Sequence, residues 1–190
     1  QLTAVLKSTG GAAGVTAKAA KDLATSLMGL TTYDDEAVLS AENLLLTFTN
    51  VGSKVFPDAT RAILDMSTAM GQDLLTTTLQ VGKALQSPVE GVTALQRVGV
   101  RLSETQKQQV KDFMAVGDAA SAQRLILAEL STEFGGSAAA AASTFGGRMA
   151  QLKNAFGEIQ ESIGNALLPI LQELATKLAG WLQAHRDEIQ

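Results

Sequence analysis

Apolar residues recur most regularly in the C-terminal third of the chain, from Ser137 to Ile189. From Phe145 they return at alternating steps of four and three residues, which is typical of a helix that packs along another helix. After Ile163 two steps of four follow one another, and this change locally unwinds a left-handed supercoil. We call this row of positions the apolar seam; it consists of Phe145, Met149, Leu152, Phe156, Ile159, Ile163, Leu167, Ile170, Leu174, Leu178 and Trp181. The seam predicts a long amphipathic, coiled-coil-like region, and its residues are the candidate interaction site.

Pro169 lies inside this helical pattern. A proline within a helix removes one backbone hydrogen bond and its ring collides with the preceding turn. We therefore expect a break or a kink between Ala166 and Pro169, so that the C-terminal region consists of two helical stretches.

The first 135 residues contain shorter segments of helical period, each bounded by glycine or by a capping residue. The expected helices cover residues 2–9, 16–28, 32–50, 57–71 and 72–86, then a helix that starts at 87, and helices at 103–116 and 118–134. Residues 98–102 are the only segment with a β preference and are expected to be an extended connector. The alanine run 138–142 either starts a long helix at Ser137 or forms a short helix that stops at Gly146 and Gly147; the hinge is favoured.

Some of these helices allow predictions about individual residues. In and just after the helix at 32–50, the residues spaced to point inward are Ala37, Ala41, Leu44, Phe48 and Val51. In the helix at 72–86 the same holds for Leu75, Leu79 and Leu85, with Gly82 allowing a close helix crossing. Two helix starts have the pattern of a capping box, Ser87 with Glu90 and Ser103 with Gln106.

These patterns together predict an all-α protein. We expect an array of short helices followed by the long amphipathic region, with boundaries at residues 1–31, 32–135 and 136–190. Short connectors between helices of this length favour antiparallel packing of neighbours.

Composition narrows the functional classes. The apolar content is 46%, carried largely by alanine, and aromatic residues make up 4%, so the core is expected to be thin. The chain has no cysteine, which excludes disulfides and thiolate chemistry. The net charge of −4, without a stripe of Lys and Arg, argues against sequence-specific nucleic-acid binding.

No set of residues in the sequence indicates catalysis or cofactor binding. His185 is the only histidine and is interpreted as the end of the amphipathic pattern. The acids Asp34, Asp35 and Glu36 are interpreted as a charge cluster at a helix N-terminus and not as a metal site. The serines lack the G-x-S-x-G and S-x-x-K patterns of known nucleophiles. We therefore predict no enzyme, no cofactor and no metal.

The run of sequence from Pro88 to Leu174, together with LSAENLLLTFTNV upstream, resembles the core region of tail tape-measure proteins of long-tailed bacteriophages or prophages. The resemblance extends from Ala37 to Leu174. It implies a helical scaffold inside the tail tube, around which tube subunits polymerise, so that its length sets the length of the tail. It also implies a part in genome delivery during infection, and a location in the virion tail, with assembly in the host cytoplasm. Implied partners are other copies of the chain, three side by side, tail-tube and tail-tip proteins, and tail assembly chaperones.

Two other classes of function stay open. A membrane-active module that enters the host envelope is suggested by the apolar segment from Ile163 to Leu182, which ends near Trp181 but is interrupted by Glu173 and Lys177. A hydrolase with an unrecognised site is the third class. Liposome binding and turnover of cell-wall substrate would discriminate between the three classes.

Overall fold

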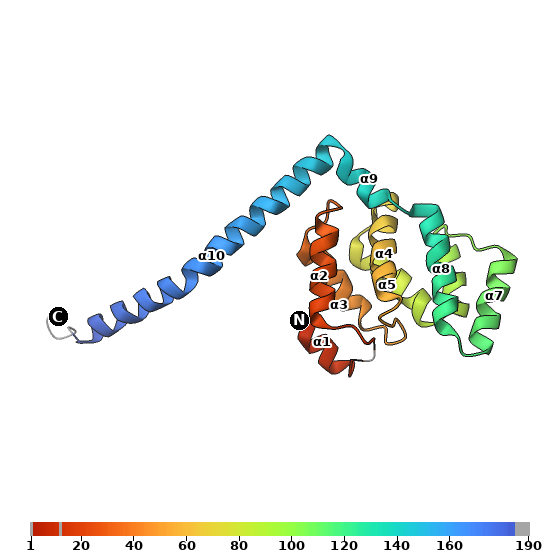
Figure 1. Ribbon diagram of the computed structural model, residues 1–190, viewed down its shortest axis with the longest axis horizontal. Helices are drawn as coiled ribbons and strands as arrows, with labels where there is room; N and C mark the ends of the chain where they lie inside the picture. Colours follow the sequence, from red (N-terminus) through yellow and green to blue (C-terminus); the bar gives the residue numbers. More distant parts are fainter. Residues whose placement is uncertain (1, 12, 185–190) are drawn as a thin grey trace. The chain divides into compact units, whose positions relative to one another are not determined.

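The computed structural model describes residues 2–11 and 13–184, with side chains placed up to residue 178. Within this part the chain forms helices joined by turns and connectors, without a β-strand, which confirms the all-α prediction (Figure 1). The helices are α1 (Leu2–Ser8), α2 (Ala17–Met28), α3 (Asp35–Leu45), α4 (Phe56–Met70), α5 (Leu74–Gln86), α6 (Pro88–Gln96), α7 (Glu104–Ala115), α8 (Ala119–Phe134), α9 (Ser137–Ser143) and α10 (Phe145–Ala184).

The chain divides into two units, residues 1–151 and residues 152–190. The first unit contains α1 to α9 and the first two turns of α10. It includes the N-terminal 31 residues, because Leu2, Ala13 and Ala20 belong to the same buried core as Leu45, Ile63 and Ile126. The expected boundaries after residues 31 and 135 therefore differ from this division, since α1 and α2 pack on α3, and α9 packs on α4.

Helix α4 lies in the middle of the first unit, where α5, α8 and α9 all pack against it (Figure 1). Its sequence explains this place, because apolar residues occur on more than one face of the helix. Phe56, Ile63, Leu64 and Met66 are all almost completely buried. Pro57 stands in the first turn of the helix, and Gly71 ends it in the left-handed conformation, as the sequence predicted.

The third helix is shorter than expected, and its buried face is shifted. Helix α3 ends at Leu45 and buries Val38, Ala41 and Leu45. Of the row predicted to point inward, Ala41 and Val51 are buried and Phe48 packs half-buried against the core, whereas Ala37 and Leu44 stay half-exposed at the side of the helix. Asp34 does start the helix, because its carboxylate accepts the backbone N–H of Ala37 at 2.7 Å. Several apolar residues occur next to one another here, and their spacing alone cannot decide which of them faces the core.

Helix α5 has a different inward face from the one predicted. Leu85 is buried, but Leu75 and Leu79 are exposed, and Thr77 and Thr78 take the inward positions. The two threonines can be buried because their hydroxyls donate to the carbonyls of Asp73 and Leu74, one turn earlier. The predicted close crossing at Gly82 is confirmed, since a Cβ at this position would overlap the ring of Phe48.

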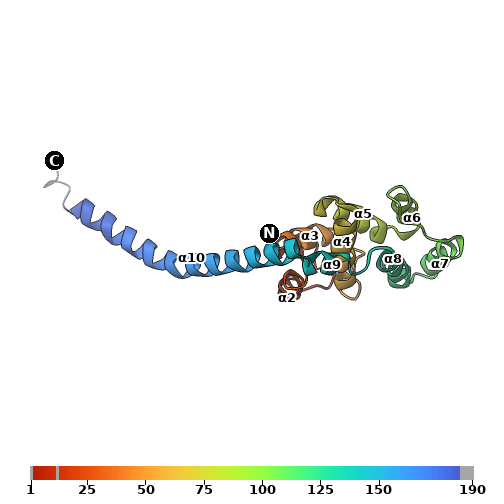
Figure 2. The same cartoon turned by 90° about the horizontal axis from the view of Figure 1, so that it is seen from above.

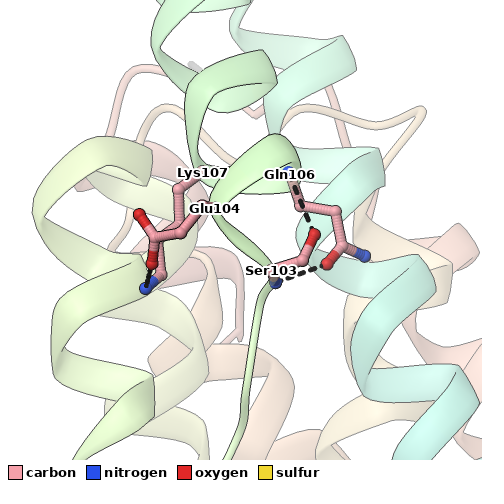
Figure 3. A network of polar contacts seen from close by, with 4 residues as sticks. All are labelled: Ser103, Glu104, Gln106 and Lys107. Atoms are coloured by element: carbon pink, nitrogen blue, oxygen red, sulfur yellow. Dashed lines mark hydrogen bonds and ion pairs between the residues drawn. The ribbon is translucent and has the colours of Figure 1, made fainter.

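The two predicted capping boxes have different outcomes. Ser87 ends α5 and starts α6, with Pro88 in the first turn of α6, but its side chain makes no capping hydrogen bond, so the box predicted with Glu90 is not formed. Ser103 forms the complete box at the start of α7: Gln106 N–H donates to Ser103 Oγ at 3.2 Å, and Ser103 N–H donates to Gln106 Oε1 at 2.7 Å (Figure 3). Residues 98–102 form a turn and an extended connector before this box, as expected.

One buried side chain joins three parts of the first unit. The amide of Gln123 on α8 donates to the carbonyl of Asn50, in the connector before α4, and to the carbonyl of Leu85 on α5, both at 2.8 Å. Gln123 is almost completely buried, and the two carbonyls give its amide nitrogen the acceptors that a buried donor needs. Sequence pattern did not identify it, since a glutamine between apolar residues ordinarily marks the exposed face of a helix.

Candidate interaction surface

The seam begins at a corner between α9 and the first turn of α10. Thr144 is the single extended residue between the two helices, and its hydroxyl oxygen accepts the N–H of Gly147 at 3.0 Å. A Cβ at Gly147 would overlap the backbone of Ala141 and Ala142. The expected hinge is therefore present, but it lies at Thr144, and both Gly146 and Gly147 belong to the first turn of α10.

Both sides of this corner are held in the first unit. On one side, the Asp65 carboxylate accepts the backbone N–H groups of Gly136 at 3.0 Å and Ala138 at 2.9 Å, so α4 caps the N-terminus of α9. On the other side, the amide of Gln151 on α10 donates to the carbonyls of Gly29 and Thr31, at 3.3 and 3.1 Å, beyond the end of α2. The first turns of α10, which belong to the first unit, are thus held by the hydrogen bonds of Gln151.

From Leu152 onward α10 forms a unit by itself and continues as one helix to Ala184 (Figure 2). Pro169 lies inside it, so the expectation of two separate helical stretches is not confirmed. One hydrogen bond is lost at a proline, and the rest of a 40-residue helix can tolerate that loss as a local bend.

The seam residues with described side chains are all exposed. Between Leu152 and Leu178 each of them leaves between 48% and 63% of its surface open, and Phe145 and Met149 in the first unit are open as well. At 100° per residue, the seam from Leu152 to Leu178 stays within an arc of about 100° on the helix. Trp181 lies on the same line in the sequence, but its side chain is outside the described residues, as is the whole of His185. The arrangement is an uncovered apolar stripe on a continuous helix.

The rest of this helix mixes polar residues with two further exposed leucines, Leu168 and Leu171, and carries few charges. From residue 152 to 178 the charged residues are Lys153, Glu158, Glu161, Glu173 and Lys177, so acids outnumber bases. Lys177 and Glu173 form an ion pair at 2.7 Å, with both side chains largely exposed. Pro169 stands on the side opposite the seam, about 130° from its centre at 100° per residue.

Three other kinds of site are a metal centre, a membrane-spanning helix and a pocket. Within the part of the chain that the structure describes, no group of three or more His, Cys, Asp or Glu side chains is arranged to hold a metal ion. None of the helices in that part has the length and apolar character needed to cross a bilayer. A groove of about 550 Å³ between α4 and α8 is lined by Asp58, Arg61, Asp65 and Arg124, but Asp65 caps α9 and Arg61 pairs with Asp58.

One ionisable group lies in the core. Glu42 on α3 is completely buried, neither carboxylate oxygen has a hydrogen-bond partner, and burial raises the pKa of this carboxyl to about 8. Sequence reasoning did not single it out, because an acid inside a helix is usually exposed.

No family model, curated protein or solved structure matches this chain.

Proposed function

We propose that this chain is a structural segment of a tail tape-measure protein of a long-tailed bacteriophage or prophage. In this proposal it serves as part of a helical scaffold for polymerisation of the tail tube, takes part in genome delivery, and is not an enzyme. One observation carries the proposal: a single helix of 40 residues, about 60 Å long at 1.5 Å per residue, whose apolar seam is open along its length.

Physical chemistry requires something to cover such a seam. Burial of a large apolar side chain is worth roughly 1.5–3 kcal/mol, so the six residues Leu152, Phe156, Ile159, Ile163, Leu167 and Leu174 represent about 10 kcal/mol or more. The proposed partners at the seam are other copies of the chain, three side by side. Tail-tube and tail-tip proteins and tail assembly chaperones are the further partners in this proposal, which places the chain inside the virion tail and, during assembly, in the host cytoplasm.

Insertion into the host membrane is the weaker alternative. A helix that lies in a lipid interface usually carries Lys and Arg on its polar face, because bilayer surfaces are anionic. The polar face of α10 between 152 and 178 has three glutamates and two lysines instead. Liposome flotation of the chain therefore provides a direct comparison, and we expect no binding.

The proposal is tested in the phage that encodes the parent protein. We expect the double substitution Ile159→Asp and Ile163→Asp to stop tail assembly, because it places two charges in the seam. Asn165→Asp together with Gln172→Asp is the matched control, since it adds the same charge to the opposite face of α10. In-frame removal of helical sequence elsewhere in the parent protein should shorten the tail in proportion. Normal tails with the seam pair, or unchanged tail length after the deletions, would contradict the proposal.

A further inference from the structure

The seam has two different repeats along α10. Up to Ile163 its steps alternate between four and three residues. From Phe156 onward the steps are three, four, four, and they then repeat: the positions are Phe156, Ile159, Ile163, Leu167, Ile170, Leu174, Leu178 and, in sequence, Trp181. This is an 11-residue repeat, because Phe156, Leu167 and Leu178 are each 11 positions apart.

A seven-residue repeat would place other residues in the contact. Continued from Ile163, it would put Ala166, Ile170, Glu173 and Lys177 on the inner line. Glu173 and Lys177 instead form an exposed ion pair with each other, at 2.7 Å. Burying charged side chains between helices costs several kcal/mol for each ion. The positions of these charges therefore favour the 11-residue line over the seven-residue line.

The 11-residue line also suits the geometry of a continuous helix. Eleven residues turn through 1,100°, which is three turns plus about 20°, so the stripe drifts slowly in the right-handed sense. Pro169 does not interrupt the line, because it stands on the opposite side of the helix, where the missing N–H and the ring face away from the contact. The helix can thus present all these positions to one straight neighbour.

A second copy of the same helix fits this surface best. The line from Phe156 to Leu178 carries seven large apolar side chains, each between 48% and 62% open, whereas an ordinary monomer surface shows such residues singly or in patches of roughly 300–600 Å². Two copies present the same repeat, so their layers have equal spacing along the whole contact.

We infer that copies of α10 associate through the 11-residue line from Phe156 to Leu178, as nearly straight helices with a weak right-handed twist, with Glu173 outside the contact and Lys177 at its edge, where the lysine pairs with Glu173. This inference rests on the self-association in the proposed function and specifies its register.

The test uses the whole 190-residue chain and measures its mass and dissociation constant by sedimentation equilibrium. We expect an oligomer that Leu174→Asp and Leu178→Asp each weaken by at least about 100-fold, since each places a carboxylate in the contact. Glu173→Gln and Lys177→Gln, at the neighbouring positions, are expected to leave the dissociation constant within about threefold. Gln172→Asp on the outer face is the charge control.

Each departure from this pattern has a distinct meaning. A seven-residue contact would make Glu173→Gln and Lys177→Gln associate more tightly and would make Leu178→Asp mild, which would overturn the register while self-association stands. A monomeric wild-type chain at concentrations of about 100 μM would overturn both the register and the self-association in the proposed function. Oligomers that no seam substitution weakens would place the contact on another surface.

Discussion

Asp65, in the middle of α4, caps the N-terminus of α9: its Oδ1 accepts the backbone N–H of Ala138 at 2.9 Å. Its other oxygen accepts the N–H of Gly136 at 3.0 Å, where the backbone has the left-handed φ of 82° that favours glycine. Helix α9 has only seven residues and no capping side chain of its own. Its place in the first unit therefore depends on a carboxylate that lies 71 residues earlier in the chain.

The first prediction concerns this cap. We expect Asp65→Ala to lower the free energy of unfolding by about 1–2 kcal/mol, because two backbone N–H groups lose their acceptor. Asp58→Ala is the matched control on the same helix, since Asp58 makes only an exposed ion pair with Arg61 and should cost less than about 1 kcal/mol. Urea denaturation measures both, and limited proteolysis should show faster cleavage between residues 135 and 147 only in Asp65→Ala. Equal losses in the two variants would contradict the capping role.

The second prediction separates two neighbouring glycines at the corner before α10. A Cβ at Gly147 would overlap the carbonyl oxygen of Ala141, whereas the nearest atom to a Cβ at Gly146 is Thr144 Oγ1 at 4.0 Å. Gly147→Ala should therefore destabilise the first unit by about 1–3 kcal/mol, because backbone atoms must move. Gly146→Ala should be neutral or stabilising by up to about 1 kcal/mol, because alanine is the better helix former. Urea denaturation measures the stability of both variants, and the rate of trypsin cleavage after Arg148 measures the local effect at the corner. If Gly146→Ala were less stable than Gly147→Ala, the corner geometry would be refuted.

The third prediction is a pH dependence that originates at Glu42. Burial raises the pKa of this carboxyl in the folded chain from 4.5 to about 8, so between these values the folded state retains a proton that the unfolded state has lost. Stability should therefore fall as the pH rises from about 5 to about 8, by up to about 1.4 kcal/mol per pH unit, and should level off above that.

Glu42→Gln removes this ionisation while keeping the shape of the side chain. We expect the substitution to flatten the dependence of unfolding free energy on pH between 5 and 8. Hydrogen bonds from Thr76, Lys107 and Ser121 lower the pKa values of Asp73, Glu104 and Asp118, respectively, so these acids contribute stability that is lost only at more acidic pH. Urea denaturation across the range pH 5–9 provides the measurement. A wild-type curve as flat as that of Glu42→Gln would show that the carboxyl is ionised in the fold.

The fourth prediction concerns the seam in solution. Ile159→Asp with Ile163→Asp should reduce association of the chain by at least about 100-fold while leaving the urea unfolding of the first unit unchanged, because both side chains are exposed in the second unit. Asn165→Asp with Gln172→Asp should change neither property. Sedimentation and urea denaturation are measured on the same samples, and a seam pair that unfolds the first unit would show that the seam is part of its core.

The amino-acid sequence by itself determined which segments are helical and where several of them start and stop. Caps such as Asp34 and Ser103, and stops such as Gly71, act within one turn, so their effect can be predicted from neighbouring residues. The long helix α10 was predicted for the same reason, because apolar residues recur along it at the helical period.

Only the tertiary structure decided what depends on neighbours distant in the chain. In α5 the buried face passes through Thr77 and Thr78 instead of Leu75 and Leu79, because α3, α4 and α6 pack on that side of the helix. The cap of Asp65 on α9 and the two hydrogen bonds of Gln123 also join segments far apart in sequence, so no local pattern could show them. The position of a helix follows from hydrophobic periodicity and capping residues that are close together in the sequence. Where a helix has several apolar faces, close packing against the other helices decides which face is buried, and that packing exists only in the folded chain.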